Sequence, residues 1–232
     1  RMDQLSYFPN HLHVNVVPLY DKEVDALNQH TKADKVYIVC SKEQLDENGS
    51  MKIFSMIDKL SAELSVASDN ETRKRLLMRR AIAHSVLRDF EAAISDFTYY
   101  ISLDDKNSLA YWQRAVCQAE MDEFNKAEGK GVLNIHSAEA DFSDAIRQNS
   151  NNAYIYYNRG NLHAGRNELS KAIDDYTIAL RIDNRLAEAY YNRGIARAKS
   201  GNKQTAIQDL SKAGELGLYD AYSVIKRLNK SK

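Results

Sequence analysis

Two sets of oppositely charged residues recur along the chain and could do chemistry. The arginines are Arg80, Arg114, Arg159 and Arg193, and the aspartates are Asp96, Asp141, Asp175 and Asp209. A guanidinium can bind an acidic partner, or it can pair with a carboxylate of its own chain through charge-assisted hydrogen bonds. Because the two sets recur together, we expect each arginine to pair with the aspartate that follows it. An acidic partner bound along the arginines is the alternative.

The remaining reactive residues do not form a catalytic arrangement. His11 and His13 could face one side of a strand and hold a metal, but no third ligand lies nearby, so we predict no metal site. His84 and His163 hold equivalent positions, and we expect both to be hydrogen-bonded core residues. Gly129-Lys130-Gly131 lacks the spacing of a phosphate loop, and no nucleophile elbow or metalloprotease motif occurs. We therefore predict that the protein is not an enzyme and needs no cofactor.

The composition argues against several classes of partner. The chain has 232 residues, with 32 Lys and Arg against 32 Asp and Glu, so its formal net charge is zero. A nucleic-acid or acidic-membrane binder normally has a basic excess, and none is present. The chain also lacks the apolar run of about 18–20 residues that a membrane-spanning helix needs. Cys40 and Cys117 lack metal-like spacing, and we expect them to be buried thiols rather than a disulfide.

The charged residues are positioned by a segment that repeats. Asn-Ala-Tyr-Ile-Tyr-Tyr-Asn-Arg-Gly at 152–160 returns as Leu-Ala-Glu-Ala-Tyr-Tyr-Asn-Arg-Gly at 186–194, an offset of 34 residues. Tracing the pattern backward gives four units over residues 74–217, starting near 74, 108, 153 and 187. The step from 108 to 153 is 45 residues, or 34 plus 11, which places an 11-residue insertion around 127–137. A fixed period of this length indicates a stacked helical array.

Residues 1–70 contain no copy of the repeat, and we predict a small α/β cap there. The stretches 12–17 and 35–40 have strand patterns, 21–29 suits a short helix, 41–44 a capping box and 46–49 a turn. Residues 51–66 should form a helix with an apolar face, made of Ile53, Phe54, Ile57, Leu60 and Leu64. After the array, residues 218–230 should form a capping helix. The prolines, Pro9 and Pro18, leave the later helices uninterrupted.

The repeat resembles the tetratricopeptide repeat, a helix-turn-helix unit. The residues that carry the resemblance are Tyr156, Gly160, His163, Ala172, Tyr176 and Ala179 in the third unit, and Tyr190, Gly194, Arg197, Ala206, Leu210 and Ala213 in the fourth. The first and second units match with Leu77, Ala81, Ala93, Phe97 and Tyr100, and with Tyr111, Ala115, Ala138, Phe142 and Ala145. The resemblance implies a mainly α fold, an α-solenoid wound as a right-handed superhelix. Gly160 and Gly194 should face Ala172 and Ala206 where two helices cross, because a larger side chain would separate the helices. The order of the segments is also similar to the C-terminal part of longer bacterial repeat proteins that are often exported.

The resemblance further implies that the first helix of each unit lines a concave groove that binds a partner. The groove residues would be Met78, Arg79, Ile82, Trp112, Gln113, Val116, Tyr157, Asn158, Asn161, Tyr191, Asn192 and Ile195. Aromatic residues are favoured interface anchors, and the asparagines could bond a peptide backbone. We expect Asn158 and Asn192 to be exposed, so that replacing both leaves the fold intact. Packing of each tyrosine against the next unit is the alternative. Met78 and Trp112 stand where a clamp for a free peptide carboxylate would need cations or polar groups, which favours a mixed apolar and polar ligand.

These observations predict a non-enzymatic module that binds a peptide or protein segment in the groove. One alternative is a structural role, in which the array packs against its own longer chain or self-associates. Another is a regulatory subunit of a separate enzyme. If the chain is a fragment of a precursor with a signal peptide, the resemblance implies an exported or periplasmic protein, and otherwise a cytoplasmic one.

Overall fold

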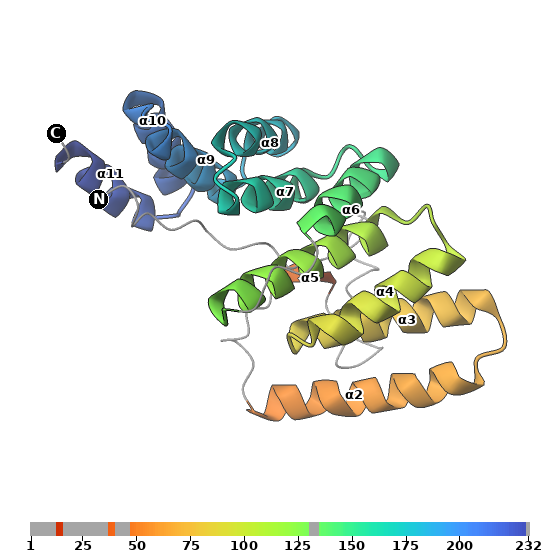
Figure 1. Cartoon of the computed structure of the whole chain (residues 1–232). Coiled ribbons are helices and arrows are strands. Elements are labelled where there is room, and N and C mark those ends of the chain that lie inside the picture. The colour runs from red at the N-terminus through yellow and green to blue at the C-terminus, as the bar shows by residue number, and fades with distance from the viewer. Residues whose placement is uncertain (1–12, 16–36, 40–46, 130–134, 231–232) are drawn as a thin grey trace. The chain divides into compact units, whose positions relative to one another are not determined.

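The computed structural model describes residues 13–15, 37–39, 47–129 and 135–230. These residues form ten helices and two short strands (Figure 1). The chain divides into two compact parts, with the boundary between Gln148 and Asn149, and each part is described by itself.

The two strands lie in the N-terminal part. β1 (His13–Asn15) pairs antiparallel with β2 (Tyr37–Val39), and Val14 stands opposite Ile38. Each strand falls inside a stretch with a predicted strand pattern, so the prediction is confirmed over these residues. The predicted helix at 21–29 and the capping box at 41–44 lie outside the described residues.

Five helices follow in the N-terminal part: α2 (Glu47–Val66), α3 (Asn70–Val86), α4 (Phe90–Leu103), α5 (Ser108–Ala127) and α6 (Ile135–Gln148). Short polar side chains begin three of them by accepting a hydrogen bond from a backbone N–H of the first turn. Asp69 caps α3, Asp89 caps α4 and Asn107 caps α5. Each helix packs on the next, and α3–α4 and α5–α6 form the first and second repeats (Figure 1). β1 contacts α3.

The C-terminal part contains the third and fourth repeats and a final helix. The helices are α7 (Ala153–Gly165), α8 (Leu169–Ile182), α9 (Ala187–Lys199), α10 (Lys203–Glu215) and α11 (Asp220–Lys230). α7 pairs with α8 and α9 with α10, and α11 packs on α10 through Ala221, Val224 and Leu228. The mainly α solenoid predicted from the repeat is therefore confirmed, and so is the final helix.

The turn between the two helices of a repeat requires a left-handed backbone. Arg88, Asn167 and Gly201 have φ values of 61°, 61° and 86° at the same place in the first, third and fourth repeats. Of these three residues only Gly201 is a glycine, the residue that adopts this conformation without strain. The repeat thus imposes the same turn on three different residues.

Glycine inside a helix serves a different purpose, the close approach of two helices. A Cβ added to Gly160 would lie 2.7 Å from Cε1 of Tyr176, whose side chain is fully buried. A Cβ added to Gly194 would lie 2.9 Å from Leu210 Cγ and 3.1 Å from the Ala206 carbonyl oxygen. The nearest neighbour of Gly160 is therefore the ring of Tyr176 rather than the predicted Ala172. Both positions leave no room for a side chain.

The insertion in the second repeat is partly helical. We expected the extra residues around 127–137, in a break of the helix. Instead α5 continues through Ala127 and α6 begins at Ile135, so the added length starts earlier and extends α5. Gly129, with φ 69°, follows the helix end. Met121 on the extension packs against the core of the first repeat, which explains why these turns are helical.

α2 packs on α3 in the way that the second helix of a repeat packs on the next repeat. Nη1 of Arg80 donates to Ser61 Oγ at 3.0 Å, and Nη1 of Arg114 donates to Thr98 Oγ1 at the same distance. In the fourth repeat Nη1 of Arg193 donates to Thr177 Oγ1 at 3.0 Å. Ser61 thus stands in α2 where Thr98 and Thr177 stand in α4 and α8.

Two details of the predicted cap are wrong. The residues at 47–49 form the first turn of α2 and not a turn between elements. Phe54 is 59% exposed and lies outside the core, whereas Ile53 and Leu60 are buried as expected.

α2 differs from the second helices of the repeats at two positions. Counting back from Ser61, Lys59 stands where the repeats have the buried aspartate and Met56 where they have the packing alanine. Lys59 is 71% exposed and pairs with Glu63 at 3.9 Å.

Candidate partner-binding surface

The recurring arginines and aspartates form four internal ion pairs. Each pair has two hydrogen bonds, from Nε and Nη2 of the arginine to the two carboxylate oxygens. The distances are 2.8 and 2.7 Å for Arg80–Asp96, 2.7 and 2.7 Å for Arg114–Asp141, 2.9 and 2.7 Å for Arg159–Asp175, and 2.9 and 2.8 Å for Arg193–Asp209. The four aspartates are buried. The pairs join the two helices of each repeat, so the arginines are not a surface for an acidic partner.

Aromatic residues one turn earlier support the same arginines. The guanidinium carbon lies 5.7 Å from the ring centre of Tyr156 in the third repeat and 5.6 Å from that of Tyr190 in the fourth. A cation over an aromatic face is attracted by the ring quadrupole. These tyrosines therefore hold the ion pairs in place.

The two histidines are hydrogen-bonded, as expected. Nδ1 of His84 lies 2.9 Å from Oδ2 of Asp89, and Nδ1 of His163 lies 2.7 Å from Oε2 of Glu168. The His163 side chain is only 5% exposed, whereas His84 is half-buried. In the fourth repeat Arg197 replaces the histidine and donates to Asp209 at 2.7 Å. The side chain at this position therefore forms a hydrogen bond or ion pair within its own repeat.

The predicted groove residues are mostly buried. Ile82, Trp112, Gln113, Val116, Tyr157, Asn158, Tyr191, Asn192 and Ile195 are buried, and Met78, Arg79 and Asn161 are half-buried. A buried side chain contributes to binding only if the surface opens or a partner rests above it. The accessible members of the predicted groove are therefore Met78 and Arg79 in the first repeat and Asn161 in the third.

The expectation that Asn158 and Asn192 are exposed is wrong, since neither has measurable exposure. Nδ2 of Asn192 donates to Tyr157 Oη at 3.1 Å and to Asn161 Oδ1 at 2.8 Å. The Tyr176 hydroxyl donates to the same Asn161 oxygen at 2.7 Å. Burial raises the pKa of Tyr157 far above its usual range. Asn192 therefore links the third repeat to the fourth by hydrogen bonds.

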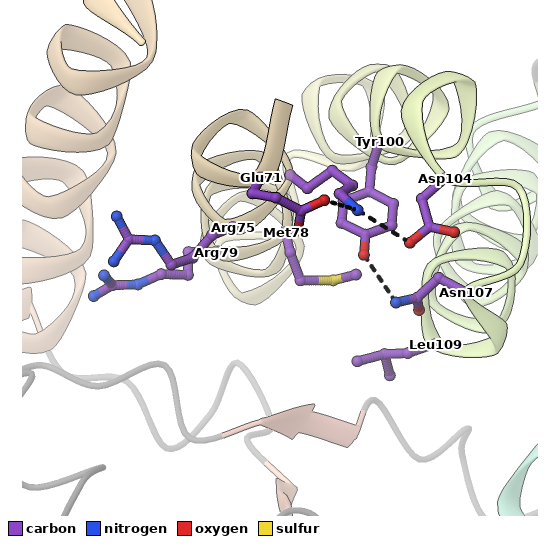
Figure 2. Close-up of a pocket in the computed structure, with 9 residues that line it drawn as sticks. Glu71, Arg75, Met78, Arg79, Tyr100, Asp104, Asn107 and Leu109 are labelled. Atoms are coloured by element: carbon purple, nitrogen blue, oxygen red, sulfur yellow. Dashed lines mark hydrogen bonds and ion pairs between the residues drawn. The ribbon is translucent and has the colours of Figure 1, made fainter. Parts of the chain in front are cut away.

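An open pocket of about 400 Å³ lies beside the accessible groove residues of the first repeat. The lining residues are Glu71, Lys74, Arg75, Met78 and Arg79 of α3, Tyr100 of α4, the cap residues Asp104 and Asn107 between α4 and α5, and Leu109 of α5. Figure 2 shows the side chain of Met78 next to the ring of Tyr100, with Leu109 below Asn107. The lining is a mixture of apolar and charged groups.

Hydrogen bonds fix one wall of the pocket. Nζ of Lys74 lies 2.7 Å from Glu71 Oε1 and 3.5 Å from Asp104 Oδ2, and the hydrogen bond to Glu71 raises the pKa of Lys74. Nδ2 of Asn107 donates to the Tyr100 hydroxyl at 2.8 Å (Figure 2). Burial raises the pKa of Tyr100, so the phenol is neutral near pH 7. Lys74 thus pairs with both acids on this wall, Glu71 and Asp104.

The described residues offer little for catalysis. No three His, Cys, Asp or Glu side chains among them are placed to hold a metal ion. Cys117 is a free, fully buried thiol, and burial raises its pKa, which suppresses thiolate chemistry. Cys40 lies outside the described residues. None of the described helices combines the length and apolarity needed to cross a membrane.

The pocket was not predicted from the sequence, although Met78 and Arg79 were. Its other cations come from the run Arg73-Lys74-Arg75 at the start of the first repeat. These three consecutive cations stand out in a chain of zero net charge, and they are the sequence signal that could have located the pocket. Asp104 and Asn107 come close to α3 only through the packing of α4 and α5.

Comparison with known proteins agrees with the geometry. A family model described as TPR repeat matches residues 164–201. MamA is 20% identical over 77% of this chain and 98% of its own, with a TM-score of 0.63. TTC0263, a thermophilic TPR protein of Thermus thermophilus, is 16% identical over 78% and 91%, with a TM-score of 0.58. YrrB, described as a TPR protein with an unusual peptide-binding site, is 17% identical over 77% and 89%, with a TM-score of 0.57. No curated protein matches in sequence.

The ion-paired helix pairs and their common turn define a helical-repeat protein. The period, the small-residue contacts and the matches show that the chain has the fold of a tetratricopeptide-repeat solenoid, and the family model matches this repeat over residues 164–201. At these identities the solved structures establish the fold and not the partner.

Proposed function

We propose that the chain is a non-enzymatic interaction module that binds a peptide or protein segment along the first helices of its repeats. The observation that carries this proposal is the open, mixed pocket between α3 and α5. These are the two helices that were expected to line the groove in the first and second repeats. The ion pairs of the repeats are satisfied internally, whereas the pocket is an accessible surface that combines charged and apolar side chains.

The predicted groove residues take two roles in this proposal. Met78 and Arg79 line the pocket and contact the partner directly, and Asn161 is accessible in the third repeat. The buried residues of the first and second repeats, Trp112 among them, give the surface beside the pocket a rigid floor. Rigid surfaces bind with less loss of conformational entropy. YrrB, a TPR protein of similar fold, has an unusual peptide-binding site, which supports the proposal.

A second candidate is occupation of the same surface by the chain itself. The contact between β1 and α3 favours it, because α3 supplies five residues of the pocket. In that case the N-terminal strands compete with an external partner, and the array acts as a scaffold for its own chain. Association of copies end to end is less suited, since the far face of α2 is charged at Lys59 and Glu63.

A capture experiment with matched variants tests the proposal. Leu109→Asp places a carboxylate in the pocket, and an acidic residue in the first turn of α5 is compatible with the helix dipole. Phe54→Asp is the control, because Phe54 is an exposed apolar residue of α2 outside the pocket. We expect a protein to be captured from source-cell extract by the wild type and the control, and to be lost with Leu109→Asp. Equal capture by all three, or capture by none, would contradict the proposal.

A further inference from the structure

We propose that the C-terminal end of α5 binds a calcium ion through side-chain oxygens of Gln118, Asp122 and Asn125. The starting observation is three fully buried oxygen atoms, Oε1 of Gln118 and both carboxylate oxygens of Asp122, which accept no hydrogen bond from the described part of the chain. Asp122 as a whole is 8% exposed. A buried carboxylate is costly unless a donor or a cation compensates its charge, so these oxygens call for a positively charged ligand.

The three side chains lie on one face of α5. Positions three and four apart in a helix stand one above the other, so Gln118, Asp122 and Asn125 form a single stripe. The orientation of the Gln118 amide is set by its other neighbour. Burial raises the pKa of Asp141, against hydrogen bonds that Arg114 and Gln118 donate to its carboxylate. Because the amide nitrogen is used there, the amide oxygen of Gln118 is left for a ligand.

The charges around this stripe favour a cation. Residues 119–128 contain four acids and one lysine, a formal charge of 1 − 4 = −3 in a chain that has no net charge. One of the acids, Glu120, pairs with Arg88 at 3.5 Å. The stripe also ends in the last turn of α5, since Asn125 lies two residues before the helix end at Ala127. The C-terminal end of a helix dipole is negative and attracts positive charge.

The ligand atoms select the kind of cation. Carboxylate and amide oxygens suit calcium or magnesium rather than zinc or copper. Magnesium keeps several waters and needs near-ideal octahedral geometry, which fully buried oxygens do not favour, whereas calcium accepts irregular sets of oxygen ligands. A lysine of a partner is a further cation, but its side chain could not reach fully buried oxygens as a single ion can.

The composition of the site also sets its expected strength. It combines one carboxylate with two amides, so it differs from a cluster of three His, Cys, Asp or Glu side chains, of which the described residues contain none. Calcium affinity falls with the number of charged ligands, and a single carboxylate places the Kd at about 0.1–1 mM.

Calorimetric titration of the full chain with calcium chloride, after removal of metal ions by a chelator, tests the inference. We expect one ion per chain, with a Kd of about 0.1–1 mM, and weaker binding of magnesium chloride. Calcium chloride at about 10 mM should raise the melting temperature by ~3–10 °C, because the ion binds the folded chain.

Two variants of adjacent residues locate the ion. Asp122→Asn keeps the shape of the side chain and should abolish both calcium binding and the rise in melting temperature. Without calcium this variant should melt at or above the wild type, because it removes an uncompensated buried charge. Glu123→Gln is the matched control, since it removes the same charge from the same turn at an exposed residue, and it should bind calcium like the wild type.

Four results would overturn the inference. They are no binding or stabilisation by calcium at about 10 mM, equal binding of magnesium, equal loss with Glu123→Gln and Asp122→Asn, or a melting temperature of calcium-free Asp122→Asn several degrees below that of the wild type. Tighter binding of methylammonium chloride than of calcium would also overturn it and assign the site to a lysine side chain. The proposed function is tested separately, because none of these residues lines the pocket.

Discussion

Replacing Asp209 by asparagine removes the one carboxylate among the four that accepts hydrogen bonds from two arginines. The Asp209 carboxylate accepts hydrogen bonds from Arg193 at 2.9 and 2.8 Å and from Arg197 at 2.7 Å. Its side chain is 5% exposed, and those of the two arginines are 12% and 24% exposed. Asparagine has nearly the same shape but no charge, so the variant leaves two partly buried guanidiniums facing a neutral amide.

The expected loss of stability follows from the cost of an unpaired buried charge. Removing one member of a buried ion pair costs ~3–5 kcal/mol. In a chain of this size each kcal/mol lowers the melting temperature by ~2–4 °C, so the expected fall is ~6–20 °C. Asp175→Asn provides a matched case with a smaller effect, because one arginine, Arg159, donates to Asp175, whereas two arginines donate to Asp209.

The assay is thermal unfolding followed by circular dichroism, with Gln208→Asn as the exposed control on the same helix. Because repeat arrays can unfold in segments, amide hydrogen exchange should also show faster exchange in α9 and α10 than in α7 and α8. A melting temperature for Asp209→Asn within about 2 °C of the control would refute the reasoning. So would a larger loss for Asp175→Asn than for Asp209→Asn.

Three further predictions concern the buried interior. Gly160→Leu should lower stability by at least ~1–3 kcal/mol through overpacking against Tyr176, and an unchanged melting temperature would reject the close contact. Asn192→Ala should cost ~1–3 kcal/mol, because the buried Tyr157 hydroxyl loses its donor; chemical denaturation measures this loss, and a stable variant would show that the bond contributes little. Cys117 should not react with a thiol reagent until the chain unfolds, and rapid labelling of the native protein would contradict its burial and raised pKa.

The repeat architecture could be predicted because its sequence pattern lies within short segments and recurs in four units. Glycine and alanine recur at equivalent places in the third and fourth units, and this recurrence predicted the close approach of Gly194 to Ala206. The ion pairs follow from the same recurrence. The strands at β1 and β2 could also be predicted, because alternation within six residues is a local signal.

Burial of the groove residues could not be predicted, because it depends on neighbouring repeats. Asn192 looks suited to a peptide backbone when its helix is considered alone. Its amide is in fact satisfied by Tyr157 and Asn161, which lie on α7, more than thirty residues earlier. A sequence pattern shows which side of a helix a residue occupies, but it does not show whether that side is covered.

The role of α2 was missed for a related reason. Its helical pattern was visible, but Lys59 and Met56 replace the aspartate and the alanine by which the repeat is recognised. The hydrogen bond from Arg80 to Ser61 establishes the relation, and only the folded chain brings these residues together. Terminal helices of an array lose the residues that would receive a further repeat, so they are the hardest to identify by matching.

The central claim is that a partner binds along the first helices of the repeats. Amide hydrogen exchange, measured on the full chain alone and with the captured partner, tests it most directly. We predict added protection in α3, in the last turn of α4 and in the first turns of α5, around Met78, Tyr100 and Leu109, with little change in α6. Protection confined to the second helices of the repeats, or to the exposed face of α2, would contradict the account and move the binding surface to the opposite side of the array.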